Sequence, residues 1–194
     1  MTELSGRKAI SHERIVDVAS RAVRREGYDG VNVTEVMRAA QLTHGGFYAH
    51  FASRDALLAE AVARAGVDIA RVLSDQSDRL VAAGASPFRA LVEIYLSMDH
   101  VRDCDNGCPV SLLSGETFRQ VPEVAEPSRR LIVNLHGRVK KVLPAGVAPD
   151  AAWTVTSALL GAVQLARALV DGDAKAANAV LSDTKKNLLA RYDT

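Results

Sequence analysis

Residues 34–51, with the sequence TEVMRAAQLTHGGFYAHF, decide the fold of this chain. Thr34 is a good N-cap for one short helix that continues to Ala40, and a second short helix is expected at 44–51 after a turn. Two short helices joined by such a turn form a helix-turn-helix, in which the second helix enters the major groove of DNA and the first crosses the backbone. The segment therefore predicts a DNA-reading motif.

The charge pattern of this segment favours contact with a polyanion. No residue between Val36 and Arg54 is acidic, whereas several side chains there can donate hydrogen bonds. Tyr48, His50 and Arg54 can reach phosphate oxygens, which position a protein without reading sequence. Side chains at the start of the second helix are better placed to reach base edges. The predicted DNA contacts are Thr34, Thr43, His44, Gly45, Gly46, Tyr48, His50 and Arg54.

The second helix also needs a face that holds it against the rest of the protein. Phe47 and Phe51 are four residues apart and therefore lie on one side of a helix. We expect both rings to be buried core residues rather than DNA contacts. The adjacent Gly45 and Gly46 have no side chains, so the backbone there can approach DNA closely.

Helical periodicity continues through almost the whole chain. Ser11 can cap a first helix that Gly27 ends, and Ser53 can cap a long helix. The apolar pattern after Pro87 predicts one helix up to the turn at 105–107, and two final helices are expected at 150–170 and 174–192. The fold predicted is all-α, with about nine helices and short loops.

Composition limits the possible functions. The chain has 194 residues, with 24 basic and 23 acidic residues and a formal charge of +1, so bulk charge does not by itself indicate a nucleic-acid partner. Such a charge also disfavours a purely architectural DNA-binding protein. The polar N-terminus does not have the pattern of a signal peptide, and no apolar stretch is long enough to cross a bilayer. A cytoplasmic protein without membrane association is therefore expected.

Several short runs resemble the TetR family of bacterial regulators: GYDG at 27–30, TEV at 34–36, GFYAHF at 46–51 and SRDALL at 53–58. Family members usually have Lys at the position of Arg54 and an Ala-Gly-Val turn where this chain has AAQL at 39–42. The resemblance implies that Tyr48 and His50 touch phosphates. It also implies a non-enzymatic homodimeric regulator, normally a repressor, that a small-molecule effector releases from double-stranded operator DNA.

The resemblance further implies two domains. Residues 1–52 are expected to form a three-helix DNA-binding domain and residues 53–194 a larger helical domain for effector binding and dimerisation. Within 150–192, small residues and one apolar helix face suit close helix packing, either between two chains or within one. We expect the first, because the resemblance implies an antiparallel four-helix interface between two chains. That stretch contains Ala158, Gly161, Ala162 and Ala166, and then Ala177, Leu181, Thr184 and Leu188.

An effector pocket, if present, should be mostly apolar. We expect Tyr95, Met98, Phe118 and Trp153 to bound it, with His136 and Gln164 as orienting polar groups. Such isolated polar residues are more often simply hydrogen-bonded than ligand-binding. The sequence names no ligand, and no cofactor or metal ion is expected.

The two cysteines leave three interpretations open. Cys108 precedes Pro109 and therefore lies at or beside a helix N-cap, where the dipole favours a thiolate. The residue is either an inert core thiol, a redox or electrophile sensor with Cys104 as its partner, or a metal ligand with His100 and Cys104. The segment GCPVSLLSGE at 107–116 is weakly similar to a Gly-Cys segment of electrophile-sensing TetR relatives. An alternative from another class is a cysteine-dependent enzyme that pairs Cys108 with His100 or His136.

Overall fold

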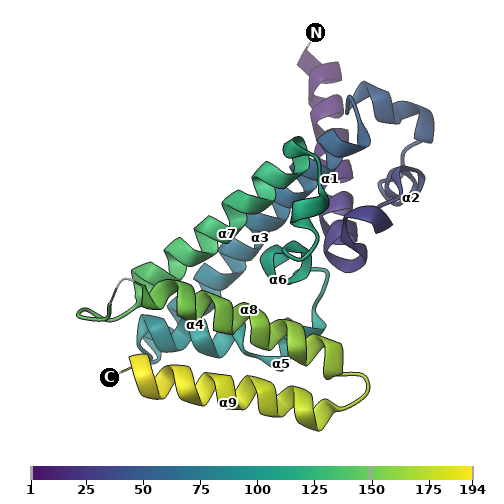
Figure 1. Ribbon diagram of the computed structural model, residues 1–194. Coiled ribbons are helices and arrows are strands. Elements are labelled where there is room, and N and C mark those ends of the chain that lie inside the picture. Colours follow the sequence, from purple (N-terminus) through teal and green to yellow (C-terminus); the bar gives the residue numbers. More distant parts are fainter. Residues whose placement is uncertain (1, 149, 194) are drawn as a thin grey trace.

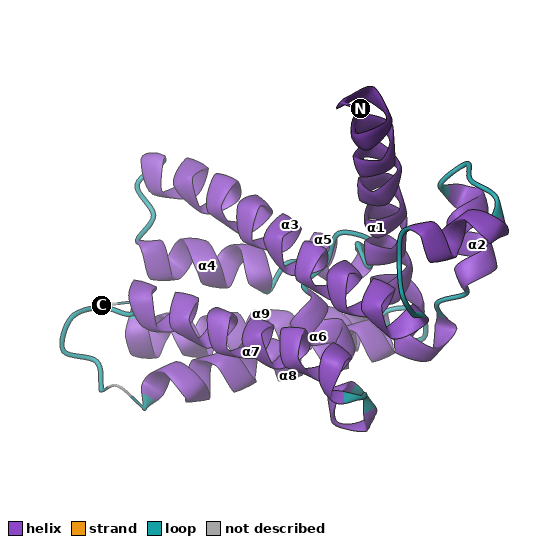
Figure 2. Cartoon of the chain, turned by 90° about the horizontal axis from the view of Figure 1, so that it is seen from above, coloured by secondary structure: helices purple, strands orange, loops and turns teal. Residues whose placement is uncertain are grey.

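The computed structural model describes residues 2–148 and 150–193, and within them it is helical without a strand (Figures 1 and 2), which confirms the all-α prediction. Nine α-helices and two short 3₁₀ helices follow one another in this part of the chain. They are α1 (Thr2–Gly30), α2 (Val33–Ala39), η1 (His44–Ala49), α3 (Arg54–Ala82), α4 (Pro87–Tyr95), α5 (Met98–Arg102), α6 (Pro109–Leu113), η2 (Thr117–Arg119), α7 (Pro122–Val142), α8 (Ala151–Leu169) and α9 (Ala174–Tyr192).

The first helix begins earlier than its sequence signals indicate. Ser11 lies inside α1 rather than at its N-cap, because the helical residues before it continue the same helix. Gly27 does interrupt the helix, with φ of 74° and a kink at that point. A side chain at Gly27 would meet the Glu116 carboxylate at 3.0 Å, so this turn favours glycine both for its conformation and for its space.

In the middle of the chain, serine N-caps mark where helices begin. The Ser53 side chain accepts a hydrogen bond from the Ala56 amide and so caps α3, as predicted. The helix expected after Pro87 is instead two helices, because the Ser97 hydroxyl accepts from the His100 amide and begins α5. A serine at this position hydrogen-bonds an amide at the start of a second helix. The apolar pattern is continuous across Ser97 and therefore did not indicate the break.

The last two helices run antiparallel and pack along their length (Figure 1), with bounds within one residue of those predicted. The face of α9 that was expected to meet a second subunit packs inside its own subunit instead. Ala177, Leu181 and Leu188 are buried in the chain's own core, against α8 and α4. Ala162 and Ala166 of α8 are buried in the same cluster, so all five residues contribute to packing within the subunit.

Two apolar clusters hold the molecule together, and α3 contributes to both. The N-terminal cluster gathers α1, α2, η1 and the first half of α3, and it also includes Leu113 of α6 and Val124 of α7. The second cluster joins the second half of α3 with α4, α7, α8 and α9. The expected division at residue 52/53 therefore falls at the start of a helix whose buried face runs through both clusters.

A buried polar cluster joins α1 to the helices that follow α6. The Tyr28 hydroxyl lies 2.6 Å from the Ser128 hydroxyl and 3.3 Å from that of Thr117. The Tyr28 amide donates to the Glu116 carboxylate. Because the cluster is shielded from water, its hydrogen bonds fix the end of α1 against η2 and α7.

Candidate nucleic-acid interface

The first helix of the motif is capped by a residue that the sequence reading missed. The Asn32 side chain accepts hydrogen bonds from the Thr34 and Glu35 amides at the start of α2. Asn ranks above Thr as an N-cap, and α2 begins at Val33, so Asn32 rather than Thr34 occupies the capping position. Thr34 is exposed, and its hydroxyl lies 3.2 Å from Nδ1 of His44, which fixes the imidazole at the start of η1.

The turn between the helices ends α2 in a Schellman motif. The Gln41 amide donates to the Arg38 carbonyl and the Leu42 amide donates to the Met37 carbonyl. This pattern places Gln41 in the left-handed region, with φ of 60°. Glycine is the usual residue at that position, because a side chain in this conformation meets the adjacent carbonyl oxygen.

The second helix of the motif is a single 3₁₀ segment, η1, rather than an α-helix. Gly45 and Gly46 lower helix propensity near its start, and Thr43 makes no side-chain capping bond there. Phe47 and Phe51 are buried as predicted, with relative exposures of 2 % and 3 % and stacked rings 5.5 Å apart. These rings anchor one side of η1 and leave its other side to solvent.

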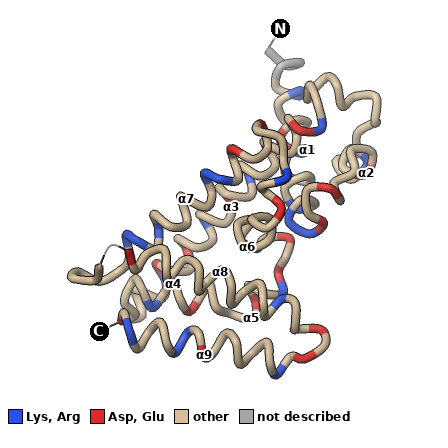
Figure 3. The backbone as a smooth tube through the Cα atoms, viewed as in Figure 1, with Lys and Arg blue, Asp and Glu red and all other residues tan. Residues whose placement is uncertain are grey.

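That outer side presents the predicted contacts to solvent. Tyr48 is 75 % exposed, and Thr43, His44 and Gly45 are exposed as well. Gly45 has open space where a side chain would lie. The backbone tube of this segment carries neither basic nor acidic colour until α3 begins (Figure 3). An exposed edge of donors without carboxylates can approach a phosphate backbone without electrostatic repulsion.

His50 and Arg54 are less available to DNA than the other predicted contacts, because His50 is partly buried and Arg54 is hydrogen-bonded within the protein. Burial, with smaller effects of His12 and Lys8, lowers the pKa of His50, and its buried Nδ1 has no hydrogen-bond partner among the described residues. A neutral ring has one N–H donor for a phosphate rather than two. The Arg54 guanidinium donates to the carbonyls of Tyr28 and Val31 and so joins α3 to the end of α1.

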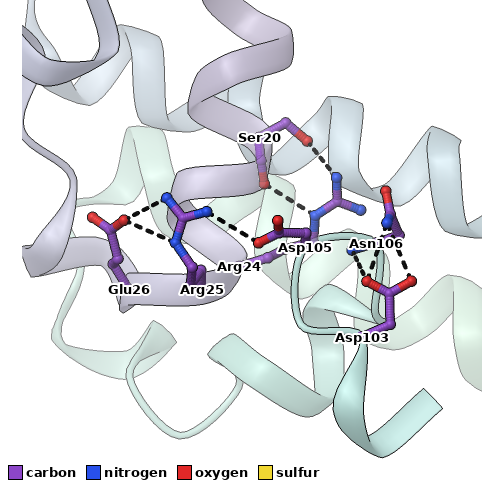
Figure 4. Close-up of polar contacts among 7 residues, drawn as sticks. All are labelled: Ser20, Arg24, Arg25, Glu26, Asp103, Asp105 and Asn106. Atoms are coloured by element: carbon purple, nitrogen blue, oxygen red, sulfur yellow. Dashed lines mark hydrogen bonds and ion pairs between the residues drawn. The ribbon is translucent and has the colours of Figure 1, made fainter. Parts of the chain in front are cut away.

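Charged residues of α1, the helix that packs beside the helix-turn-helix, contact the loop between α5 and α6 (Figure 4). Arg25 pairs with Asp105 at 3.2 Å, in the loop between α5 and α6. Arg24 is buried, donates to the Ser20 carbonyl, and lies 3.7 Å from Asp68. Its Nη1 has no partner among the described residues, and burial lowers the pKa of Arg24 despite the nearby carboxylates.

The structure does not gather the expected effector residues around one cavity. Tyr95 is fully buried, whereas Phe118 is 73 % exposed and Gln164 is also exposed. His136 stacks on the half-exposed Trp153 at a centroid distance of 3.9 Å, on the outside of α7 and α8. Helical spacing alone could not tell an inward ring from an outward one at these positions. Met98 is partly buried and packs against the second apolar cluster.

Two hollows flank α3 instead. One, of about 460 Å³, lies between α3, α4, α5 and the loop after α5. The other, of about 420 Å³, lies between α3, α6 and α7. Both include Ile69 and Leu73 in their walls, so α3 separates the two spaces. Both volumes are in the range of small-molecule sites.

Cys108 is the N-cap of α6, as the Cys-Pro sequence predicted, and only 2 % exposed. Burial raises the pKa of its thiol, which opposes thiolate formation near neutral pH. Nε2 of His100 faces the Cys108 amide at 3.2 Å, and Nδ1 lies 2.9 Å from the Tyr95 carbonyl. This arrangement uses both ring nitrogens of His100 on backbone groups. Among the described residues, no group of three or more His, Cys, Asp or Glu side chains is arranged to hold a metal ion.

The exposed donor edge on a helix-turn-helix, joined to a helical body, is the architecture of DNA-binding transcriptional regulators. Residues 15–61 match the family model described as bacterial regulatory proteins, tetR family. The helix-turn-helix and its flanking helices thus match the TetR family model, as the sequence resemblance indicated. No curated protein matches the sequence.

Solved structures agree with this assignment at the level of the fold. A TetR-family regulator from Cytophaga hutchinsonii shares 17 % identity at a TM-score of 0.76, covering 96 % of this chain and 96 % of that one. One from Agrobacterium tumefaciens shares 17 % at a TM-score of 0.74, with coverages of 93 % and 98 %. The reduced form of E. coli NemR shares 15 % at a TM-score of 0.71, with coverages of 92 % and 94 %. Within the part of the chain that is described, no helix is long and apolar enough to span a membrane.

Proposed function

We propose that this protein is a TetR-family homodimeric repressor that binds a pseudo-palindromic operator through its two copies of η1. The observation that carries the proposal is the outer edge of η1, where exposed donors lie in a stretch without carboxylates. Thr43 and His44 are the proposed base-reading residues, and Tyr48 and His50 the proposed phosphate contacts. Gly45 gives the backbone room to approach.

Arg54 has a different proposed role from the one expected. Because its guanidinium is bonded to the carbonyls of Tyr28 and Val31, it is proposed to position η1 by holding α1 and α3 together. Thr34 is likewise proposed to act through His44, whose Nδ1 it faces. Arg54 and Thr34 are thus proposed to affect operator affinity indirectly, by holding the helix-turn-helix in position.

Dimerisation is proposed through the outward faces of α8 and α9, within 150–192. α8 exposes Trp153 and Leu165 at 49 % and 57 %, large apolar side chains that a second copy could cover. Gly161 has open space where a side chain would lie, which permits close helix approach. Two recognition elements one helical turn of DNA apart need such a dimer.

Regulation is proposed to pass from a hollow beside α3 to η1. A small apolar molecule that binds there favours one arrangement of α3 and α6 over another, and both helices continue into the N-terminal cluster. A ligand shifts this equilibrium only by its difference in affinity for the two arrangements. The DNA-bound form is proposed to be the ligand-free one.

A gel shift with the DNA upstream of the protein's own gene tests the proposal. We expect a retarded complex with one dimer per site at low salt, and loss of most of the affinity in His44→Ala and Tyr48→Ala. Asp75→Asn is an exposed control on α3, outside the proposed contact edge. Failure to bind any such fragment, or equal binding by the η1 variants, would contradict it.

A second candidate is regulation through the Cys108 thiol, since this residue lines the hollow between α3 and α7. Its burial and raised pKa favour slow modification, so an effector bound without a covalent bond is the preferred proposal. Full modification with a thiol reagent separates the two. Release from DNA that Cys108→Ser abolishes would favour the thiol mechanism, whereas unchanged DNA binding would exclude it.

A further inference from the structure

The groove between α3 and α7 is lined largely by apolar side chains. Its walls are side chains of α3 and α7 with the first residues of α6, and α3 and α7 lie side by side in Figure 1. The two helices pack closely at Gly66, where a side chain would lie 2.2 Å from the end of Leu131. Beside this contact the groove opens into about 420 Å³. The apolar lining residues include Val67, Ile69, Leu73, Val110, Leu131 and Leu135.

The charged residues of this groove are all basic. Arg130, Asn134 and Arg138 line it from successive turns of α7, and no acidic residue is among its described lining residues. Arg130 is exposed, and Arg138 uses one Nη2 donor on the Ala70 carbonyl at 3.1 Å. A guanidinium has five N–H donors, so Arg138 retains donors for an anion. The groove therefore combines an apolar body with a cationic rim.

The hollow on the other side of α3 differs in its charge. Glu93, Asp99 and Asp103 line it, together with Arg79 and His100. The two spaces have similar volumes and share Ile69 and Leu73, so size does not distinguish their ligands. The charge of the lining does distinguish them. A carboxylate is repelled by the acidic residues of the hollow beside α4 and α5 and attracted by the arginines of the groove between α3 and α7.

We infer that the groove between α3 and α7 binds an anionic amphiphile, a molecule with a carboxylate head and an alkyl body. Its head lies against Arg130 and Arg138, which bind carboxylates through charge-assisted hydrogen bonds. Its alkyl body lies along Val67 and Leu131. The assignment of this molecule as the effector rests on the proposed function.

Helix α6 connects the groove to the DNA-binding end of the molecule. Pro109 and Val110 at the start of α6 line the groove, and Leu113 at the other end of the same helix is buried in the N-terminal cluster. α6 also packs against α1. An alkyl chain that displaces α6 thus acts on the helix that supports the helix-turn-helix.

Isothermal titration calorimetry on the full chain without DNA tests the site, with decanoate as the probe below its micelle concentration. We expect decanoate to bind at least tenfold more tightly than decanol, which has the same chain without a charge. Arg130→Gln and the double variant Arg130→Gln/Arg138→Gln should weaken decanoate at least tenfold and leave decanol unchanged. Arg129→Gln is the matched control, an exposed arginine on α7 that does not line the groove.

Each alternative has its own signature. Equal affinity for decanoate and decanol, or no loss in Arg130→Gln, would overturn recognition of the anion. Preference for decyltrimethylammonium would place the ligand in the acidic hollow instead, and lack of binding by all three probes would overturn the site. Val67→Trp should fill the groove and remove both decanoate and decanol.

A gel shift with the same proteins separates this inference from the proposed function. Release of operator by decanoate in the wild type but not in the double variant supports both. Operator binding without a response to decanoate overturns the effector assignment and leaves the repressor proposal standing. Decanoate binding by a chain that binds no DNA overturns the repressor proposal, and with it the effector role, while the anion site stands.

Discussion

Replacing Gln41 by glycine should make the protein more stable. Gln41 is exposed and has φ of 60° at the residue after the α2 C-cap. A left-handed backbone costs a residue with a side chain about 1–2 kcal/mol. Glycine removes that cost but adds about 0.4–1 kcal/mol of unfolded-state entropy. The free energy of unfolding should therefore rise by about 0.5–1 kcal/mol.

Urea unfolding followed by circular dichroism measures this difference. Gln41→Ala is the control, because it removes the side chain and keeps the strained conformation, and we expect it to give no gain. Gln41→Asn should lie between the two, since Asn tolerates the left-handed region better than most residues. A Gln41→Gly variant no more stable than Gln41→Ala would show that backbone strain is not stored at this turn. Operator affinity should not change, because the turn's hydrogen bonds use backbone atoms.

Three other changes test further parts of the structure. Phe47→Ala should lower the free energy of unfolding by about 3–5 kcal/mol, as thermal denaturation would show, because it empties the buried side of η1. Tyr28→Phe should cost about 1 kcal/mol by removing the hydroxyl beside Ser128, and an unchanged melting temperature would argue against that bond. Burial lowers the pKa of His100 to about 4. The neutral ring should therefore make its full contribution to folding stability above pH 6.5, and this contribution should decline as pH falls toward 4. His100→Asn should therefore flatten part of the pH dependence of stability in that window, and an identical profile would refute the role of this ring.

Much of the fold was readable from the sequence, because caps and apolar periodicity act locally. Ser53, Cys108 with Pro109, and the bounds of the last two helices were placed correctly. The errors concerned N-caps that the apolar pattern does not reveal. Asn32 rather than Thr34 caps α2, and Ser97 divides a helix that looked continuous.

The motif was easier to predict than the effector site for a physical reason. η1 is built from residues close in sequence, so the spacing of Phe47 and Phe51 indicates which side is buried. The hollows beside α3 depend on how distant helices pack, and no spacing within one helix shows which neighbour it meets. Trp153 and Phe118 were expected to line a pocket and instead face solvent. Ala177 and Leu181 were expected at a dimer interface and instead fill the subunit's core.

The most direct test of the central claim is the affinity of the dimer for its upstream DNA, measured by fluorescence anisotropy at two salt concentrations. The account predicts specific binding that weakens with salt, and at least tenfold loss in Tyr48→Ala with an unchanged melting temperature, because Tyr48 is 75 % exposed and contributes little to the core. Wild-type affinity in Tyr48→Ala and His44→Ala together would contradict the claim that the outer edge of η1 contacts DNA.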